Sequence, residues 1–201
     1  IADLALTATE MAELHVEAAH LSQHYDYDQI TPLNRAAAQA LCPSPAYHGG
    51  YLDKGAGHLH PLAFALGLAR AAKAAGVRIF ERSEVTQITQ GTKPMISCRD
   101  GSVTSNHAIL ACNGYLGHLN RRVAARVMPI NNFIAATEPL GAEAAKVLTQ
   151  DIAVADTKFV VNYFRLSHDR RLLFGGGENY SYHFPSDIAA KVRRPMLKIF
   201  P

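Results

Sequence analysis

Apolar residues recur at helical intervals in two long segments near the start of the chain. The first follows Thr7-Ala8-Thr9-Glu10, which has the spacing of a capping box, and continues to about Leu21. The second is PLAFALGLARAAKAAG, residues 61–76, which begins with proline and ends with glycine. Between them, Thr31-Pro32 predicts a short helix that ends near Cys42. Residues 43–57 contain two prolines and four glycines, which predicts a loop with at most one short strand.

After residue 76 the pattern becomes that of strands. The predicted strands are 77–80, 84–89, 94–98, 101–104 and 107–112. Asp100-Gly101 lies between the third and the fourth, which is a strong hairpin signature. The last, HAILAC, is an apolar strand that stops at Asn113-Gly114. A helix followed by these strands is typical of the middle of a doubly wound sheet with a β-meander inserted as a crossover.

The C-terminal third of the chain predicts a different architecture. The predicted elements are strands at 129–137 and 158–166, a hairpin return at 171–174 and a short helix at 142–148. Ser186 is placed to begin a final helix that Pro195 should kink or end. Strands joined by short turns indicate an antiparallel sheet in a second domain. We therefore predict an α/β plus α+β fold, with a partial doubly wound domain and a second, antiparallel-sheet domain.

Composition narrows the class of protein. The chain has 201 residues, of which 48% are hydrophobic and 18% charged, so it is neither disordered nor a membrane protein, and no apolar run could form a membrane span. A net charge of +3 without a Lys/Arg block predicts no nucleic-acid partner. Three widely spaced cysteines, Cys42, Cys98 and Cys112, argue against a disulfide framework and for a reducing, cytoplasmic compartment.

Three segments resemble familiar motifs but lack the residues or the arrangement that those motifs require. Gly55-Ala56-Gly57-His58-Leu59-His60 resembles a dinucleotide fingerprint, but His60 replaces the third glycine, and the preceding GGYLDK does not look like a buried strand. Glu17, His20 and His24 share a helical face, but the HExxH motif is absent and the sequence does not specify the further ligands that the histidine pair would need, so no metal site is predicted. Ser167-His168-Asp169 is consecutive and predicts a hairpin turn rather than a catalytic triad.

Two stretches remain as candidates for a binding site. The period of two along residues 159–166 places Val161, Tyr163 and Arg165 on one face, which suits a cavity for a polar or anionic group. Periodicity alone slightly favours the alternative, a half-exposed strand with an arginine at its rim. Gly175, Gly176 and Gly177 then follow an apolar strand. Consecutive glycines allow the backbone to bend or something flat to approach.

Four segments taken together resemble one family. They are GHLHPLAFALGLARAAKAAGVRIFE, HAILACNGYLG, ATEPL and FRLSHDRRLLFGGGENY. In this order and spacing they are similar to the D-amino-acid-oxidase-like (DAO) FAD-dependent oxidoreductases, closest to the gamma-glutamylputrescine oxidase branch. Members also have an N-terminal βαβ unit with the GxGxxG turn and a C-terminal flavin segment, and neither is present here. We therefore expect this chain to be an internal fragment that is inactive by itself.

The resemblance implies roles for domains and residues. Residues 1–54 are expected to be a helical part and linker to the substrate domain, 55–126 a partial FAD-binding domain, and 127–201 an antiparallel substrate-binding domain. The positions matching the family's FAD contacts are Val85, Ala111, Asn113 and Gly114. Those matching its substrate pocket are Tyr163, Arg165, Gly175 and Gly176. No catalytic side chain is assigned.

The resemblance also implies a reaction. Family members oxidise the C–N bond of an amine or amino acid by hydride transfer to FAD, while the protein orients the amine and excludes water. Two alternatives stay open: a non-catalytic substrate-binding or interaction fragment without cofactor, and a nicotinamide-dependent reductase that uses Gly55 to Glu81. Exposed sheet edges in a fragment would also favour self-association.

Overall fold

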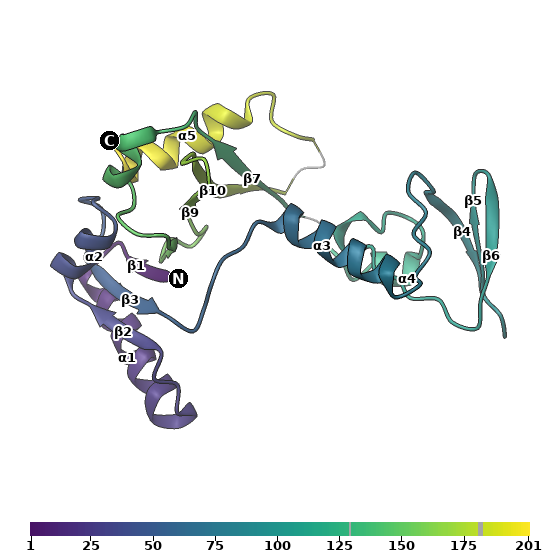
Figure 1. Cartoon of the computed structure of the whole chain (residues 1–201), viewed down its shortest axis with the longest axis horizontal. Helices are drawn as coiled ribbons and strands as arrows, with labels where there is room; N and C mark the ends of the chain where they lie inside the picture. The colour runs from purple at the N-terminus through teal and green to yellow at the C-terminus, as the bar shows by residue number, and fades with distance from the viewer. Residues whose placement is uncertain (129, 181–182) are drawn as a thin grey trace. The chain divides into compact units, whose positions relative to one another are not determined.

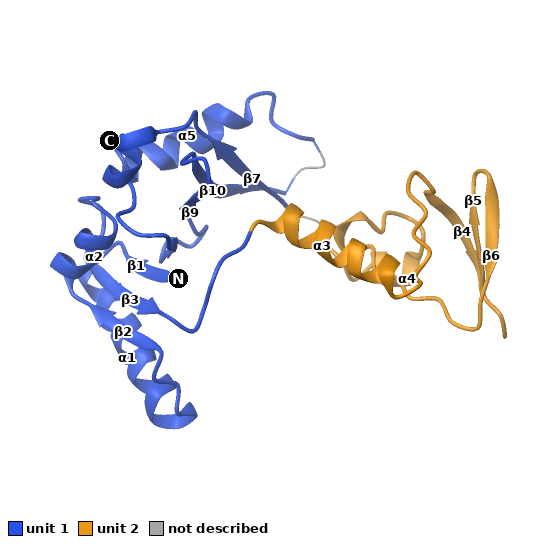
Figure 2. Ribbon diagram, viewed as in Figure 1, with its two compact units in different colours: residues 1–59, 131–201 blue, residues 60–130 orange. Residues whose placement is uncertain are grey.

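The chain forms two compact units. The computed structural model describes residues 1–201 except Pro129, Ser181 and Tyr182. Unit 1 consists of Ile1–Leu59 and Asn131–Pro201, and unit 2 of His60–Ile130 (Figure 2). In the described part of the chain, no helix combines the length and apolar character needed to cross a membrane.

Unit 1 is built on a seven-stranded sheet (Figure 1). In spatial order, its strands are β2 (Ile30–Leu33), β3 (Gly49–Asp53), β1 (Ala2–Ala5), β8 (Ala153–Asp156), β9 (Tyr163–Leu166), β10 (Leu172–Asn179) and β7 (Asn131–Ala136). Neighbouring strands are antiparallel except β1 and β8, which are parallel. The β1–β8 pair joins the strands of the first 59 residues to those of the last 71.

Capped helices pack on this sheet. They are α1 (Ala8–Tyr25), α2 (Arg35–Leu41) and α5 (Ile188–Ile199), with a 3₁₀ segment η2 at Gly141–Lys146. The side chains of Thr7, Asn34 and Asp187 each accept a hydrogen bond from a backbone N–H in the first turn of the helix that follows. In Figure 1, α5 lies beside β10 and β7.

The alternation of side chains gives the sheet one apolar face and one mixed face. Phe164 and Phe174 stack with ring centroids 5.5 Å apart and belong to the buried core with Val192 of α5. Tyr163, Arg165 and Leu173, which are next to them along the strands, are only half-buried. Ile134 on β7 is 58% exposed. The half of the sheet formed by β8, β9, β10 and β7 therefore has a mixed face that retains access to solvent.

Unit 2 contains a helix and a β-meander. Its elements are α3 (Pro61–Ala74), β4 (Val85–Thr89), β5 (Met95–Cys98), β6 (Gly101–Thr104), the 3₁₀ turn η1 (Asn113–Tyr115) and α4 (Arg121–Ala124). β4, β5 and β6 form an antiparallel sheet in that order. α3 has no buried residue although Arg70 and Lys73 are its only charged residues, and Leu62, Phe64 and Leu68 are each more than half exposed. A helix of this composition normally packs against other elements on several sides.

Several sequence predictions are confirmed. Thr7 and Glu10 form the predicted cap of α1, because the Thr7 side chain accepts from the Glu10 N–H. The helix that begins at Pro61 and the hairpin at Asp100-Gly101 are present. Gly76 follows α3 with φ of 89°, the left-handed conformation expected at this position.

Two predicted strands of unit 2 are absent. Neither 77–80 nor 107–112 is a strand, and Ile109 is 90% exposed. A strand is defined by pairing with the backbone of a neighbour. The described residues of this unit supply no partner for either segment, so their apolar pattern alone does not produce a sheet.

Other predictions for unit 1 are wrong in detail. Thr31 and Pro32 lie in β2 rather than in a helix, and GGYLD is a mostly buried strand, β3. The long strand predicted at 158–166 is a loop followed by the short β9. Asp187, not Ser186, caps the final helix, and Pro195 lies inside that helix without ending it. The strand predicted at 129–137 is β7, with Pro129 outside the described residues.

Replacing Gly50 by alanine is expected to destabilise unit 1. Its φ is 148°, and a Cβ there would lie 1.9 Å from the Asp3 carbonyl oxygen on the neighbouring strand. We expect Gly50→Ala to lower the free energy of unfolding by about 3 kcal/mol. Urea denaturation followed by circular dichroism measures this. Gly57→Ala is the matched control, because no atom lies within 4 Å of its Cβ position; equal stability losses in the two variants would contradict the packing argument.

Candidate functional site

The predicted site residues fall into two groups, one in each unit. Those assigned to a substrate pocket are Tyr163, Arg165, Gly175 and Gly176, and all lie on β9 and β10 of unit 1. Those assigned to a cofactor are Val85, Ala111, Asn113 and Gly114, and all lie in unit 2. Each group is described within its own unit.

Tyr163 lies across the neighbouring strand β10. Tyr163 and Gly175 are directly opposite in the β9–β10 ladder, and a Cβ on Gly175 would be 2.2 Å from Tyr163 Cζ. Tyr163 Oη donates a hydrogen bond of 2.8 Å to Asn132 Oδ1 on β7. Burial raises the pKa of Tyr163. The phenol therefore stays neutral near pH 7 and is held at two points, under its ring and at its hydroxyl.

Arg165 lies two residues further along β9, on the same face. It is paired with Leu173 on β10 and Ala153 on β8. Its Nη1 donates a 3.3 Å hydrogen bond to the carbonyl of Leu166. No carboxylate among the described residues lies within 4.0 Å of this guanidinium. Arg165 consequently keeps most of its five N–H donors available for an anionic group.

A buried polar cluster holds β9 in place from the other face. Asp156 at the end of β8 accepts hydrogen bonds from the backbone N–H of Asn162 at 2.9 Å and from Asn162 Nδ2 at 2.7 Å. The Tyr47 hydroxyl donates to the same carboxylate at 3.5 Å. Burial raises the pKa of Asp156, against the opposing effect of the hydrogen bonds from Asn162. The cluster fixes the loop before β9 and with it the face on which Tyr163 appears.

The glycines of β10 serve the protein's own packing. The flat group that approaches Gly175 is the Tyr163 ring, and Gly176 lies against the buried Asn162, whose Oδ1 would be 3.0 Å from a Cβ there. The ladder between β10 and β7 shifts register between Gly175 and Glu178, so the backbone also bends there. The glycine run therefore does both things expected of it: the backbone bends there, and the flat ring of Tyr163 approaches it.

Asn132 and Asp156 were not identified from the sequence as functional residues. The alternation of residues 131–136 does place Asn132 on one face with Ile134. Its meeting with Tyr163 depends on the order β9-β10-β7, which joins residues 31 positions apart.

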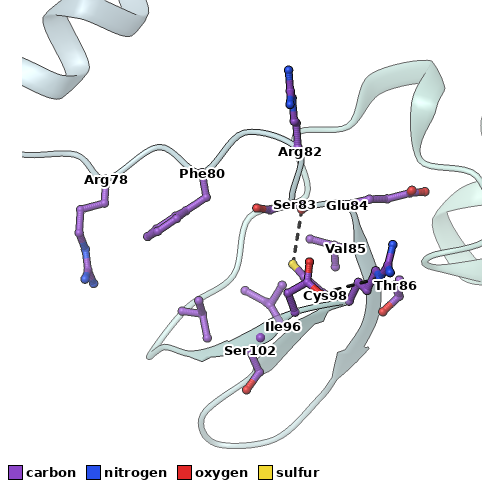
Figure 3. A pocket seen from close by; sticks show the side chains of 14 residues that line it. Arg78, Phe80, Arg82, Ser83, Glu84, Val85, Thr86, Ile96, Cys98 and Ser102 are labelled. Carbon is purple, nitrogen blue, oxygen red and sulfur yellow. Dashed lines mark hydrogen bonds and ion pairs between the residues drawn. The ribbon is translucent and has the colours of Figure 1, made fainter.

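In unit 2, Val85 lines an open cavity between the meander and the segment before it. Phe80, Arg78 and Arg82 of that segment also line the cavity, as does Cys98 of β5, although the Arg82 side chain points away from the meander (Figure 3). Cys98 Sγ donates to the Ser83 carbonyl at 3.4 Å. A register shift lies between Val85 and Gln87. Such a bulge leaves one residue's backbone groups outside the ladder, where a ligand can reach them.

Ala111, Asn113 and Gly114 are exposed in a tight turn. Asn113 has φ of 48°, a left-handed conformation that asparagine tolerates better than most residues. No atom lies within 4 Å of the position that a Cβ on Gly114 would occupy. The turn thus offers an open backbone surface with small side chains, the kind of surface that a nucleotide can approach closely.

The motifs rejected from the sequence have local structural roles. Asp53 Oδ1 accepts hydrogen bonds from the backbone N–H groups of Gly55 and Ala56, which forms a turn before α3. His60 caps α3 by accepting from the Ala63 N–H. Among the described residues, no group of three or more His, Cys, Asp or Glu side chains is arranged to hold a metal ion.

Comparison with known families gives a match over nearly the whole chain. The family described as "FAD dependent oxidoreductase" (DAO) matches residues 2–201. The chain is 40% identical to "Probable oxidoreductase OrdL" of Rhizobium meliloti over 188 residues, which is 93% of this chain and 43% of that protein. It is 35% identical to "Gamma-glutamylputrescine oxidoreductase" of Escherichia coli, over 89% of this chain and 42% of that protein. The chain therefore spans less than half the length of these relatives.

Solved structures show the same fold. Glycine oxidase from Geobacillus kaustophilus superposes with a TM-score of 0.74 at 17% identity, over 98% of this chain and 53% of that one. L-proline dehydrogenase from P. horikoshii has a TM-score of 0.68 at 15% identity, over 100% and 55%. These similarities confirm the predicted α/β plus α+β fold class, which the structure realises as a mixed sheet with helices and a separate antiparallel three-stranded sheet.

Replacing Gly175 by alanine should displace the Tyr163 ring. The new methyl group would overlap three atoms of that side chain, so the ring must move off β10 and its bond to Asn132 should break. We expect Gly175→Ala to lower the free energy of unfolding by about 2 kcal/mol. Urea denaturation measures the loss, and adding Tyr163→Ala should recover part of it by removing the overlap. No recovery in the double variant would contradict this account.

Proposed function

The chain belongs to the DAO family of FAD-dependent oxidoreductases, and we propose that the full-length protein oxidises the carbon–nitrogen bond of an amine or amino acid. The observation that carries this proposal is the mixed face of the sheet in unit 1. There a neutral phenol, Tyr163, and an arginine without a carboxylate partner among the described residues, Arg165, lie on one strand and one face. These groups suit a substrate with a polar nitrogen and an anionic group.

Residues of unit 2 fit the proposed FAD. The irregular backbone at Val85 lies beside an open cavity, and the exposed turn at Ala111, Asn113 and Gly114 leaves room for close approach. When bound, FAD supplies the two-electron oxidation that no side chain can perform. We assign Val85 to the adenine side of the nucleotide and the turn to its pyrophosphate side, as the family resemblance implies.

Residues of unit 1 would bind and orient the substrate. Arg165 can hold a carboxylate through paired N–H donors, and Tyr163 contributes a hydroxyl at a fixed position. Oriented in this way, a substrate amine is held in place on a face that also carries the apolar side chains of Leu173 and Ile134. The name of the Escherichia coli relative, gamma-glutamylputrescine oxidoreductase, supports gamma-glutamylputrescine as the first substrate to test.

The non-catalytic alternative is less well supported. A binding module without cofactor would have no need for the match to an FAD-dependent family over residues 2–201. The exposed apolar side chains of α3 do support association with a further protein surface, either in the rest of the polypeptide or in another copy. The free cysteines Cys42, Cys98 and Cys112 fit the proposed cytoplasmic location.

The proposed activity can be tested on purified full-length protein. We expect a flavin absorption spectrum, and bleaching of that spectrum when gamma-glutamylputrescine is added without oxygen. Peroxide release or reduction of a dye would then report turnover. A full-length protein that remains colourless after incubation with FAD would contradict the proposal. If the flavin is bleached by a different amine and not by gamma-glutamylputrescine, the proposed reaction holds and only the substrate is different.

Enlarging Gly114 should weaken cofactor binding. Leucine at this position has space in the structure, so the fold should tolerate it, but its side chain would occupy the surface assigned to the pyrophosphate. We expect Gly114→Leu to raise the Kd for FAD at least about tenfold. Flavin fluorescence titration of the apoprotein measures this.

Gly57→Leu is the matched control for this prediction. Gly57 also has no atom within 4 Å of its Cβ position, but it belongs to the turn organised by Asp53. Its substitution should leave the Kd for FAD unchanged. If instead Gly57→Leu raises the Kd for FAD and Gly114→Leu does not, the cofactor site would be at the GxGxxH segment, residues 55–60.

A further inference from the structure

The hydroxyl of Tyr163 has its single proton already committed. It donates that proton to Asn132 Oδ1 over 2.8 Å. A phenolic oxygen has one O–H and lone pairs that accept. Toward any other group, this hydroxyl can therefore act only as an acceptor.

The packing around the ring keeps this arrangement in place. Because the Tyr163 side chain fills the space above Gly175, its ring is directed across β10 toward β7, where Asn132 lies. Asn132 is opposite Glu178 in the β10–β7 ladder, so its position is set by the sheet. The Tyr163 hydroxyl reaches the Asn132 amide because of the order of the strands and because Gly175 has no side chain. No ligand is needed to bring them together.

Arg165 has the opposite hydrogen-bonding character. A guanidinium has only donors, and of its five N–H groups the structure shows one bonded, to the Leu166 carbonyl. Tyr163 and Arg165 are separated by one residue on β9, which places their Cα atoms about 7 Å apart. One strand thus presents an acceptor and a set of donors to the same face.

We propose that Asn132 is a positioning residue that makes Tyr163 an acceptor for an N–H group of the substrate, while Arg165 takes the substrate's carboxylate. This rests on the proposed function and deepens it, since it assigns to Asn132 the orientation of the group that recognises the substrate amine. A carboxylate has no proton to donate near pH 7, so it gains nothing from the Tyr163 oxygen. The two recognition elements are therefore not interchangeable.

Removing Asn132 changes what Tyr163 can recognise. In Asn132→Ala the hydroxyl proton is free to turn toward the substrate, and the oxygen loses its fixed acceptor role. Asn132→Asp preserves an oxygen that accepts the Tyr163 proton. The alanine variant should consequently lose preference for amines, and the aspartate variant should keep it.

Calorimetric titration of the full-length protein tests this with three probes of equal chain length. They are 4-aminobutyrate, butylamine and butyrate, which carry both groups, the amine alone and the carboxylate alone. We expect Asn132→Ala to raise the Kd of 4-aminobutyrate and of butylamine about tenfold and to leave that of butyrate unchanged or lower it. Tyr163→Phe should reproduce the loss for both amines, and Asn132→Ala should add little to it. Arg165→Met should show the opposite pattern, with the loss confined to the two carboxylates.

Several outcomes would overturn the inference. A purely structural role for Asn132 would weaken all three probes together. An Asn132→Asp variant as impaired as Asn132→Ala toward amines, or an unchanged protein that binds neither amine, would also contradict it. Calorimetry needs neither flavin nor turnover, so a protein without FAD would refute the proposed function while these titrations still decided the role of Asn132.

Discussion

The parallel pairing of β1 with β8 is the contact on which the architecture of unit 1 depends. Among the described strands it is the one ladder between the first 59 residues and the last 71. Backbone hydrogen bonds extend it beyond the strands, from Thr157 N–H to the Leu4 carbonyl at 3.1 Å and from Leu6 N–H to Thr157 Oγ1 at 3.1 Å. Without this pair the chain would have two smaller sheets, each with an additional unpaired edge.

The same junction determines which side chains reach the mixed face. β8 ends at Asp156, whose buried carboxylate accepts hydrogen bonds from the backbone N–H and the side-chain amide of Asn162. These bonds hold the loop that leads into β9. This places Asn162 and Phe164 in the core and leaves Tyr163 and Arg165 opposite. A shift of one residue would exchange the two sets, because side chains alternate along a strand. The buried polar cluster thus acts on the candidate site through register, without facing it.

Sequence patterns predicted local structure well and long-range contacts poorly. The alternation along β9 correctly placed Tyr163 and Arg165 on one face, and the capping box, the Pro61 helix and the meander are local signatures that hold. Strands at 77–80 and 107–112 failed because pairing requires a partner that composition does not reveal. Asn132 was missed for the same reason, since its meeting with Tyr163 depends on the order of strands in the finished sheet.

The glycines show why a binding motif cannot be judged from residue type alone. Gly50 is required by the Asp3 carbonyl beside it, and Gly175 by the ring of Tyr163. In both cases the protein's own atoms occupy the space that a side chain would take. Gly57 and Gly114 face open space, but the turn around Gly57 is already explained by the hydrogen bonds of Asp53. Gly114 also lies in a turn with its own backbone hydrogen bonds, so open space at a glycine is compatible with the cofactor site proposed from the family resemblance but does not by itself identify it.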